Sequence, residues 1–353
     1  MNFADYLTQK LPAVETEIMR GLPAAPAAPA APAAAASTPS ERTRADLNAY
    51  LYQPLAHFSA GGGKRVRPVL CCLGAEAVGG SAEAALPVAC AIEDFQSAAL
   101  IHDDIADKSE LRRGEKCLYK TLGTGLAINV GDSALVNVVR RVTVADLLSD
   151  QLKVRVIDAL LAMQEHTLEG QALDLGWAQN ERWDVTSEQY LFMALSKTAY
   201  YSAAYPLVLG ALIGGADQKT LDTLKEFGLK VGLAFQLQDD LLNLVGNAQV
   251  QGKDFRSDIT EGKRTLAVVY ALEHLGSAEK TELVSILSAH TTTTLKLQRA
   301  VELMESANAI KFVRTHALAL VDEAKHVLEN VILTKDARDT LLSMADFFVN
   351  RER

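Results

Sequence analysis

Cysteine is scarce in this chain of 353 residues, and its four copies form no recognisable pattern. They are Cys71, Cys72, Cys90 and Cys117, and their spacing matches neither a metal site nor a redox pair. The seven histidines are also scattered, without the pairing of a zinc site. Because the cysteines fall largely in apolar segments, we expect buried free thiols in a reducing compartment.

An excess of positive charge and a long apolar run are also missing. The formal net charge of −9 argues against a nucleic-acid partner, which requires concentrated basic surface. It does not exclude diphosphate ligands, because local clusters matter more than the total. No signal-peptide pattern begins the chain, and the longest apolar stretch, near Ala203–Ala216, is too short to span a bilayer. We therefore expect a soluble cytoplasmic protein.

Alternating strand patterns are few, and aromatic residues make up only 6% of the chain. Hydrophobic residues reach 49%, so a large aliphatic core is available. From Ser40 onward the apolar spacing is helical and almost continuous, with short breaks such as Gly61-Gly62-Gly63. These features predict an all-α fold, a single large helical bundle around a central apolar cavity.

The N-terminal region divides into two parts ahead of the main domain, which we place at residues 40–353. Residues 1–20 are predicted as a helix, and residues 21–39 as a Pro/Ala-rich linker with prolines at intervals of three: Pro23, Pro26, Pro29 and Pro32. The helix is expected to contribute either to the core or to a dimer contact. Every motif lies at or beyond Gly61, so removing residues 1–38 is predicted to leave the functional site intact.

Two aspartate-rich segments lie inside apolar helical runs: Asp103-Asp104-Ile105-Ala106-Asp107 and Asp239-Asp240-Leu241-Leu242-Asn243. In each segment the first and last residues are four apart and share a helical face. One such segment alone would be read as an exposed carboxylate pair. Two of them, each followed by basic residues, favour Mg²⁺ held by carboxylates and by the phosphates of a substrate.

Basic and glycine-rich segments accompany the aspartates. Lys64 and Arg67 lie in a glycine-rich turn, Gly61 to Pro68, that enters a helix and suits diphosphate oxygens. Alone, each basic segment would be a solvated surface feature. The others are Arg112-Arg113-Gly114, the pair Lys197-Thr198 at the end of an amphipathic run, and the charged stretch that contains Lys253 and Lys263.

With these motifs in this order, the chain resembles the trans-isoprenyl diphosphate synthase (polyprenyl synthetase) family over roughly residues 40–353, and geranylgeranyl diphosphate synthases in particular. The resemblance implies a homodimeric, Mg²⁺-dependent prenyltransferase with three ions, which joins isopentenyl diphosphate to an allylic diphosphate. A terpene cyclase would lack the glycine-rich turn and the Lys197-Thr198 pair. A non-catalytic subunit of a heteromeric synthase would tend to lose aspartates of the first segment, and all three remain.

The resemblance also implies individual roles. Metal ligands would be Asp103, Asp104, Asp107 and Asp239, with Asp240 and Asn243 around the last of them. The allylic diphosphate would be bound by Arg112, Lys197, Lys253 and Lys263, and isopentenyl diphosphate by Lys64, Arg67, Gln96 and Arg113. Thr198 and Gln236 would stabilise the allylic cation. Two positions depart from the family: Asn243 stands where many members have Asp, and Gln96 where many have His or Tyr.

Residues before Asp103 carry an expectation about product length. Family members that make fifteen-carbon products typically place aromatic residues four and five positions before this aspartate, and here those positions are Ala99 and Ala98. Phe95 lies on the same face, about 12 Å further along the helix. This pattern favours a twenty-carbon product, geranylgeranyl diphosphate, with farnesyl or longer-chain products as alternatives.

Overall fold

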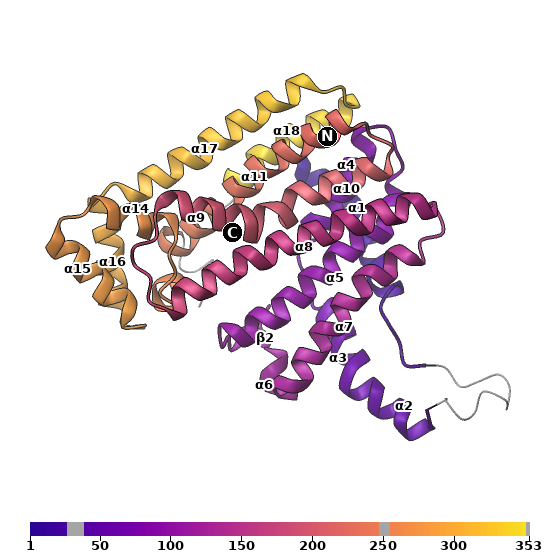
Figure 1. Cartoon of the computed structure of the whole chain (residues 1–353), viewed down its shortest axis with the longest axis horizontal. Helices are drawn as coiled ribbons and strands as arrows, with labels where there is room; N and C mark the ends of the chain where they lie inside the picture. The colour runs from indigo at the N-terminus through magenta and orange to yellow at the C-terminus, as the bar shows by residue number, and fades with distance from the viewer. Residues whose placement is uncertain (27–38, 247–254, 351–353) are drawn as a thin grey trace.

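The computed structural model describes residues 1–26, 39–246 and 255–350, and nearly all of them are helical (Figure 1). The all-α prediction is confirmed. The only strands in these ranges are β1 (Leu111–Arg112) and β2 (Glu115–Lys116), an antiparallel hairpin that follows the first aspartate segment. Lys253 and most of the predicted Pro/Ala linker lie outside the described residues.

The helices of the first half of the chain are α1 (Phe3–Arg20), α2 (Glu41–Leu47), the π-helix η2 (Asn48–Tyr52), α3 (Gln53–Ala60), α4 (Val66–Ala77), α5 (Ala82–Ala106), α6 (Leu118–Leu122), α7 (Thr124–Thr143) and α8 (Asp150–Gln179). Those of the second half are α9 (Ser187–Ala194), the π-helix η3 (Leu195–Ala204), α10 (Tyr205–Ile213), α11 (Gln218–Val245), α13 (Ser257–Thr260), α14 (Leu266–His274), α15 (Ser277–Ser288), α16 (Thr294–Ser306), α17 (Ala309–Val327), the 3₁₀-helix η5 (Leu328–Asn330) and α18 (Lys335–Asn350). Figure 1 shows α14, α15 and α16 gathered at one end of the molecule and α2 at the opposite end.

Helix α5 lies in the middle of the bundle. It contributes to the main apolar core, which it shares with α4, α10 and α11, and to a smaller cluster with α3 and α7. By length and composition α5 could cross a membrane, the one helix in the described ranges that could, although the sequence analysis placed the longest apolar stretch elsewhere. Because 72% of its apolar window is buried in the structure, α5 has the character of a core helix.

Helix α1 packs into the same core as the rest of the bundle. Phe3, Val14 and Ile18 are at most 1% exposed, and the Phe3 ring lies 5.5 Å and 6.1 Å from the ring centroids of Phe347 and Phe348 in α18. The predicted N-terminal helix is therefore present and belongs to the core. The structure does not support the expectation that residues 1–38 can be removed without effect on the site.

Two glycines allow α8 and α11 to approach η3 closely. A Cβ atom added at Gly170 of α8 would lie 2.1 Å from the backbone nitrogen of Lys197. One added at Gly232 of α11 would lie 2.8 Å from Cα of Ala199. The Lys197-Thr198 pair, predicted at the end of an amphipathic run, lies within a helix, because the chain continues as a π-helix to Ala204. These two crossings position the next turns of α8 and α11 beside η3.

Candidate active site

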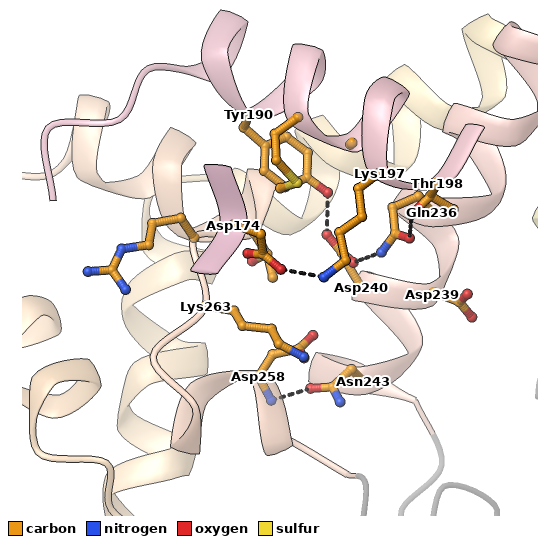
Figure 2. A pocket seen from close by; sticks show the side chains of 14 residues that line it. Asp174, Tyr190, Lys197, Thr198, Gln236, Asp239, Asp240, Asn243, Asp258 and Lys263 are labelled. Atoms are coloured by element: carbon orange, nitrogen blue, oxygen red, sulfur yellow. Dashed lines mark hydrogen bonds and ion pairs between the residues drawn. The ribbon is translucent and has the colours of Figure 1, made fainter. Parts of the chain in front are cut away.

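A first cavity of about 250 Å³ is lined by side chains from α8, α9, η3, α11 and α13 and from the segment that leads to α14 (Figure 2). It brings together motifs that are far apart in the sequence. Its polar lining consists of Asp174, Tyr190, Lys197, Thr198, Gln236, Asp239, Asp240, Asn243, Asp258, Lys263, Arg264 and Thr265. The second aspartate segment thus shares one cavity with the predicted cations Lys197 and Lys263.

Both lysines of this cavity are held by carboxylates. Lys197 Nζ donates to Asp174 Oδ2, and Lys263 Nζ lies 3.3 Å from Asp258 Oδ1 and 2.7 Å from Glu261 Oε2. Although burial lowers the pKa of Lys197, the nearby Asp174 and Asp103 raise it above its ordinary value. Both side chains therefore carry positive charge beside the cavity, which suits an anionic ligand such as a diphosphate.

A chain of hydrogen bonds fixes the polar groups of η3 and α11 (Figure 2). Thr198 Oγ1 donates to Gln236 Oε1 at 2.8 Å, and Gln236 Nε2 donates to Asp240 Oδ1 at 2.7 Å. The other oxygen of Asp240 accepts from the buried Tyr190 hydroxyl at 2.5 Å. Asp240 therefore orients Gln236 and, through it, the Thr198 hydroxyl. Asp239 points away from this chain of hydrogen bonds in Figure 2.

The first aspartate segment ends α5 on the side of the same lysines. Asp103 Oδ1 accepts from Gln171 Nε2 of α8 at 2.7 Å. Asp104 is buried, and its Oδ1 accepts two hydrogen bonds from Arg112, at 3.0 Å and 2.6 Å. Burial raises the pKa of Asp103 to about 6, and Lys197 acts against this rise. The charges of Lys197 and Lys263 act on both Asp103 and Asp107, although none of the three aspartates of this segment lines the first cavity.

The donor set around the first cavity fits a hard divalent cation. In the described ranges no three carboxylate, histidine or cysteine side chains converge closely enough to hold a metal ion by themselves. Mg²⁺, however, is usually bound through one or two carboxylates, waters and substrate phosphates. Oδ2 of the buried Asp104 has no hydrogen-bond partner, and burial disfavours the charge on Asp103. A cation would relieve both penalties.

A second cavity, of about 200 Å³, lies against the glycine-rich turn. All four residues predicted to bind isopentenyl diphosphate line it: Lys64, Arg67, Gln96 and Arg113. Arg67 Nη2 donates to Ser202 Oγ at 2.8 Å and to Tyr201 Oη at 3.0 Å, whereas its Nε and the Gln96 Oε1 are buried without a partner. Such unsatisfied atoms are costly unless a ligand pairs with them.

The two cavities adjoin along η3 and α11. Phe235 lines the second cavity and Gln236, the next residue, lines the first. In the same way Ser202 of η3 lines the second cavity and Thr198, one turn earlier, lines the first. Two cavities that are lined by neighbouring residues of the same two helices, each with cationic side chains, suit two anionic ligands held close together.

Several residues of the site escaped the sequence analysis. Asp258 and Arg264 lie in the charged stretch that was recognised, although no role was assigned to them there. Asp174 is a single acidic residue in a long helix, and nothing in the sequence around it indicates a functional role. Tyr190 gives no signal, because its hydroxyl matters only through Asp240 of another helix.

The residues expected to set product length are not equivalent. Ala98 is fully buried in the cluster between α3, α5 and α7, whereas Ala99 is partly exposed. Phe95 is 3% exposed and meets the Tyr201 ring edge-on, with 5.8 Å between centroids. Of the two alanines, Ala99 is therefore the position at which a larger side chain would enter open space.

Gly170→Ala is expected to lower kcat by about tenfold to a hundredfold, because its methyl group would displace the backbone of Lys197. Gly176→Ala is the matched control, since it lies on the same helix and its added Cβ has nothing within 4 Å. Steady-state kinetics of the two variants test this. Equal activities would mean that the close crossing of α8 and η3 does not position Lys197.

The sequence and the fold were compared with known proteins. The profile of the polyprenyl synthetase family matches residues 48–304. A short chain isoprenyl diphosphate synthase from Methanothermobacter thermautotrophicus is 40% identical over 299 residues, which cover 84% of this chain and 89% of that protein. The crystal structure of geranylgeranyl pyrophosphate synthetase from Pyrococcus horikoshii superposes with a TM-score of 0.85, at 29% identity and with 99% and 98% of the two chains covered.

A further structure, geranylgeranyl pyrophosphate synthase from Corynebacterium glutamicum complexed with isoprenyl diphosphate and magnesium, gives a TM-score of 0.84 at 26% identity, covering 99% of this chain and 100% of that one. The family match, the similar sequence and the similar fold all indicate the same family. This chain belongs to the polyprenyl synthetase family and is an isoprenyl diphosphate synthase of the trans-prenyltransferase type.

Proposed function

We propose that the enzyme joins isopentenyl diphosphate head-to-tail to an allylic diphosphate and releases mainly geranylgeranyl diphosphate. The observation that carries this proposal is the pair of adjoining cavities. Both present cationic side chains, but only the first is lined by residues of an aspartate segment, the second one, and its Lys197 and Lys263 act on Asp103 and Asp107 of the other segment. This asymmetry supports a metal-assisted leaving diphosphate in the first cavity and a second diphosphate that remains intact in the other.

The allylic diphosphate is assigned to the first cavity, where Lys197 and Lys263 bind phosphate oxygens together with Arg112 from outside it. The sequence adds Lys253 to this set, a residue outside the described ranges. Three Mg²⁺ ions are assigned to four aspartates: Asp103, Asp104, Asp107 and Asp239. When bound, Mg²⁺ would neutralise the charge that develops on the departing diphosphate. The charged lysines act in the same direction: Asp174 keeps Lys197 in place, and Asp258 and Glu261 keep Lys263 in place.

Isopentenyl diphosphate is assigned to the second cavity. Lys64, Arg67 and Arg113 supply positive charge, and Gln96 offers an amide at the same wall. Arg67 is already oriented by Ser202 and Tyr201, so little freedom is lost when it binds phosphate. The shared wall then places the double bond of this substrate beside the allylic carbon of the other.

Thr198 and Gln236 are assigned to the allylic cation, because they line the first cavity from η3 and α11, the two elements that also line the second cavity. The hydrogen bonds from Gln236 to Asp240 and from Tyr190 to Asp240 fix the orientation of the Gln236 side-chain amide. In the condensation the allylic carbon–oxygen bond breaks first, giving the allylic cation and diphosphate, and the double bond of isopentenyl diphosphate then forms the new carbon–carbon bond to that cation. We assign the proton that is then lost to the released diphosphate, which is a base next to the new bond.

Ala99→Phe is expected to shorten the main product to fifteen carbons, because the phenyl group would occupy the space one turn below Asp103. Conversely, Phe95→Ala should lengthen the product by removing the ring that meets Tyr201. Ala98→Val serves as the control, because Ala98 lies in the α3/α5/α7 cluster. Chromatography of the dephosphorylated products measures the outcome. If both variants made the wild-type product, the length-limiting wall would lie on another helix.

The proposed reaction is tested by incubating the purified protein with isopentenyl diphosphate, Mg²⁺ and each allylic primer in turn, followed by sizing of the products. A twenty-carbon main product is expected. Fifteen or twenty-five carbons would refute the assigned length while leaving the reaction intact. No incorporation with any primer would refute the reaction itself.

We also propose a homodimer in the cytoplasm. Exposed apolar side chains recur on α7 and α8, a surface suited to a second copy of this chain: Ile128, Val136, Val154, Leu161 and Leu168. The four cysteines are buried and unpaired, as expected in a reducing compartment. A monomer mass from sedimentation velocity would contradict the proposed dimer. Recovery of the protein in the membrane pellet after cell fractionation would contradict the proposed location.

A further inference from the structure

Arg65 occupies an unusual place in the glycine-rich turn between α3 and α4. Its backbone is left-handed, with φ of 48°, and it immediately precedes the first residue of α4. Its side chain has no exposed surface, although it lines the second cavity between Lys64 and Arg67. A non-glycine residue seldom adopts this backbone conformation unless the surroundings stabilise it.

The guanidinium of Arg65 is fully engaged by the protein. Nε donates to Glu15 Oε1 of α1 at 2.8 Å, and Nη1 donates to Glu93 Oε1 of α5 at 2.7 Å. Nη2 donates to the carbonyl oxygen of Ser59, near the end of α3, at 2.6 Å. Arg65 therefore joins three helices through one buried group, and these bonds leave it little capacity to bind a phosphate.

The partner Glu93 poses an electrostatic problem for the second cavity. It is 4% exposed, lines this cavity and lies one helical turn before Gln96. A buried carboxylate at this place would repel a diphosphate unless a cation neutralised it. The Arg65–Glu93 pair supplies that neutralisation, so that Lys64, Arg67 and Arg113 determine the charge that a ligand meets.

We propose that Arg65 is a positioning residue for the diphosphate in the second cavity. It neutralises Glu93 and fixes the turn that carries Lys64 and Arg67, and through Glu15 it makes α1 part of the support of this cavity. The inference rests on the assignment of isopentenyl diphosphate to the second cavity.

Arg65→Gln is expected to raise KM for isopentenyl diphosphate by about tenfold or more, with a much smaller change in KM for the allylic substrate. In this background Glu93→Gln should lower KM again, because the uncompensated carboxylate is removed. Glu93→Gln alone should leave KM for isopentenyl diphosphate unchanged or lower. A purely structural role of Arg65 predicts neither the selectivity for one substrate nor the rescue.

Arg141→Gln is the matched control. Arg141 is also buried, pairs with Asp94 of α5, and donates to the carbonyl oxygens of Glu17 and Ile18 in α1, yet it lines neither cavity. Its substitution should lower the melting temperature and leave both KM values unchanged. If Arg65→Gln behaved like Arg141→Gln, or raised both KM values equally, the positioning role would be refuted.

Two further variants keep the inference testable if Arg65→Gln does not fold. Glu15→Gln changes a side chain that is 36% exposed, and it should raise KM for isopentenyl diphosphate about threefold, since its two charge-assisted hydrogen bonds with Arg65 are weakened. An unchanged KM would refute the role of α1. Lys64→Ala tests the underlying assignment separately: if it did not raise this KM, the second cavity would not be the isopentenyl diphosphate site.

Discussion

Asp103→Ala and Asp239→Ala are each expected to reduce kcat several hundredfold or more, a loss of at least ~3 kcal/mol of transition-state stabilisation. Asp103 and Asp239 belong to different aspartate segments. Lys197 connects them: its charge acts to lower the pKa of Asp103, and its side chain lines the first cavity together with Asp239. Loss of either carboxylate removes a hard oxygen ligand from the proposed Mg²⁺ sites. The remaining lysines cannot replace a divalent cation at the departing diphosphate.

Asp222→Ala is the control for this prediction, because Asp222 is an exposed residue of α11, the helix that carries Asp239. It should retain wild-type kcat. Calorimetric titration of Mg²⁺ in the presence of an unreactive diphosphate adds a second measurement, in which Asp103→Ala and Asp239→Ala should bind fewer or weaker ions. Near wild-type turnover in either variant would contradict the metal assignment.

The faces of single helices were predictable from the sequence, because helical geometry alone aligns residues four apart. Lys64 and Arg67 could be placed together because they lie in one glycine-rich turn, and both line the second cavity. The division of the predicted residues between two cavities was expected only from the family resemblance and not from their spacing. In the structure it depends on how closely α8 and α11 cross η3. Gly170 and Gly232 permit this close crossing, because backbone atoms of Lys197 and Ala199 lie where a Cβ atom would otherwise be.

Where sequence reasoning failed, the deciding contact came from a distant part of the chain. The spacing before Asp103 treats Ala98 and Ala99 alike, yet the helices α3 and α7 bury Ala98 and leave Ala99 partly exposed. The apolar spacing places the Lys197-Thr198 pair at the end of an amphipathic run, because an α-helical period does not describe the π-helix that continues to Ala204. The ion pairs of Asp174 and Arg65 likewise require partners on other helices.

Removal of residues 1–20 should abolish soluble, active protein. Four apolar or aromatic side chains of α1 are buried in the main core: Phe3, Tyr6, Val14 and Ile18. At about 1.5–3 kcal/mol each, their loss costs roughly 6–12 kcal/mol, comparable with the whole stability of a typical domain, about 5–15 kcal/mol. Truncation would also leave Arg65 without Glu15 and Arg141 without two carbonyl acceptors. Soluble yield, thermal unfolding by circular dichroism and kcat measure the effect.

Replacement of residues 27–38 by a Gly/Ser segment of equal length is the contrasting variant. These residues lie outside the described ranges and contain none of the motifs, and equal length preserves the reach between α1 and α2. We expect wild-type kcat, KM values and melting temperature. If the replacement lost activity while it stayed folded, the Pro/Ala segment would have a role beyond that of a spacer.

If instead removal of residues 1–20 left a folded enzyme of normal melting temperature, the burial of α1 would contribute little to stability, and Glu15 could not support the second cavity.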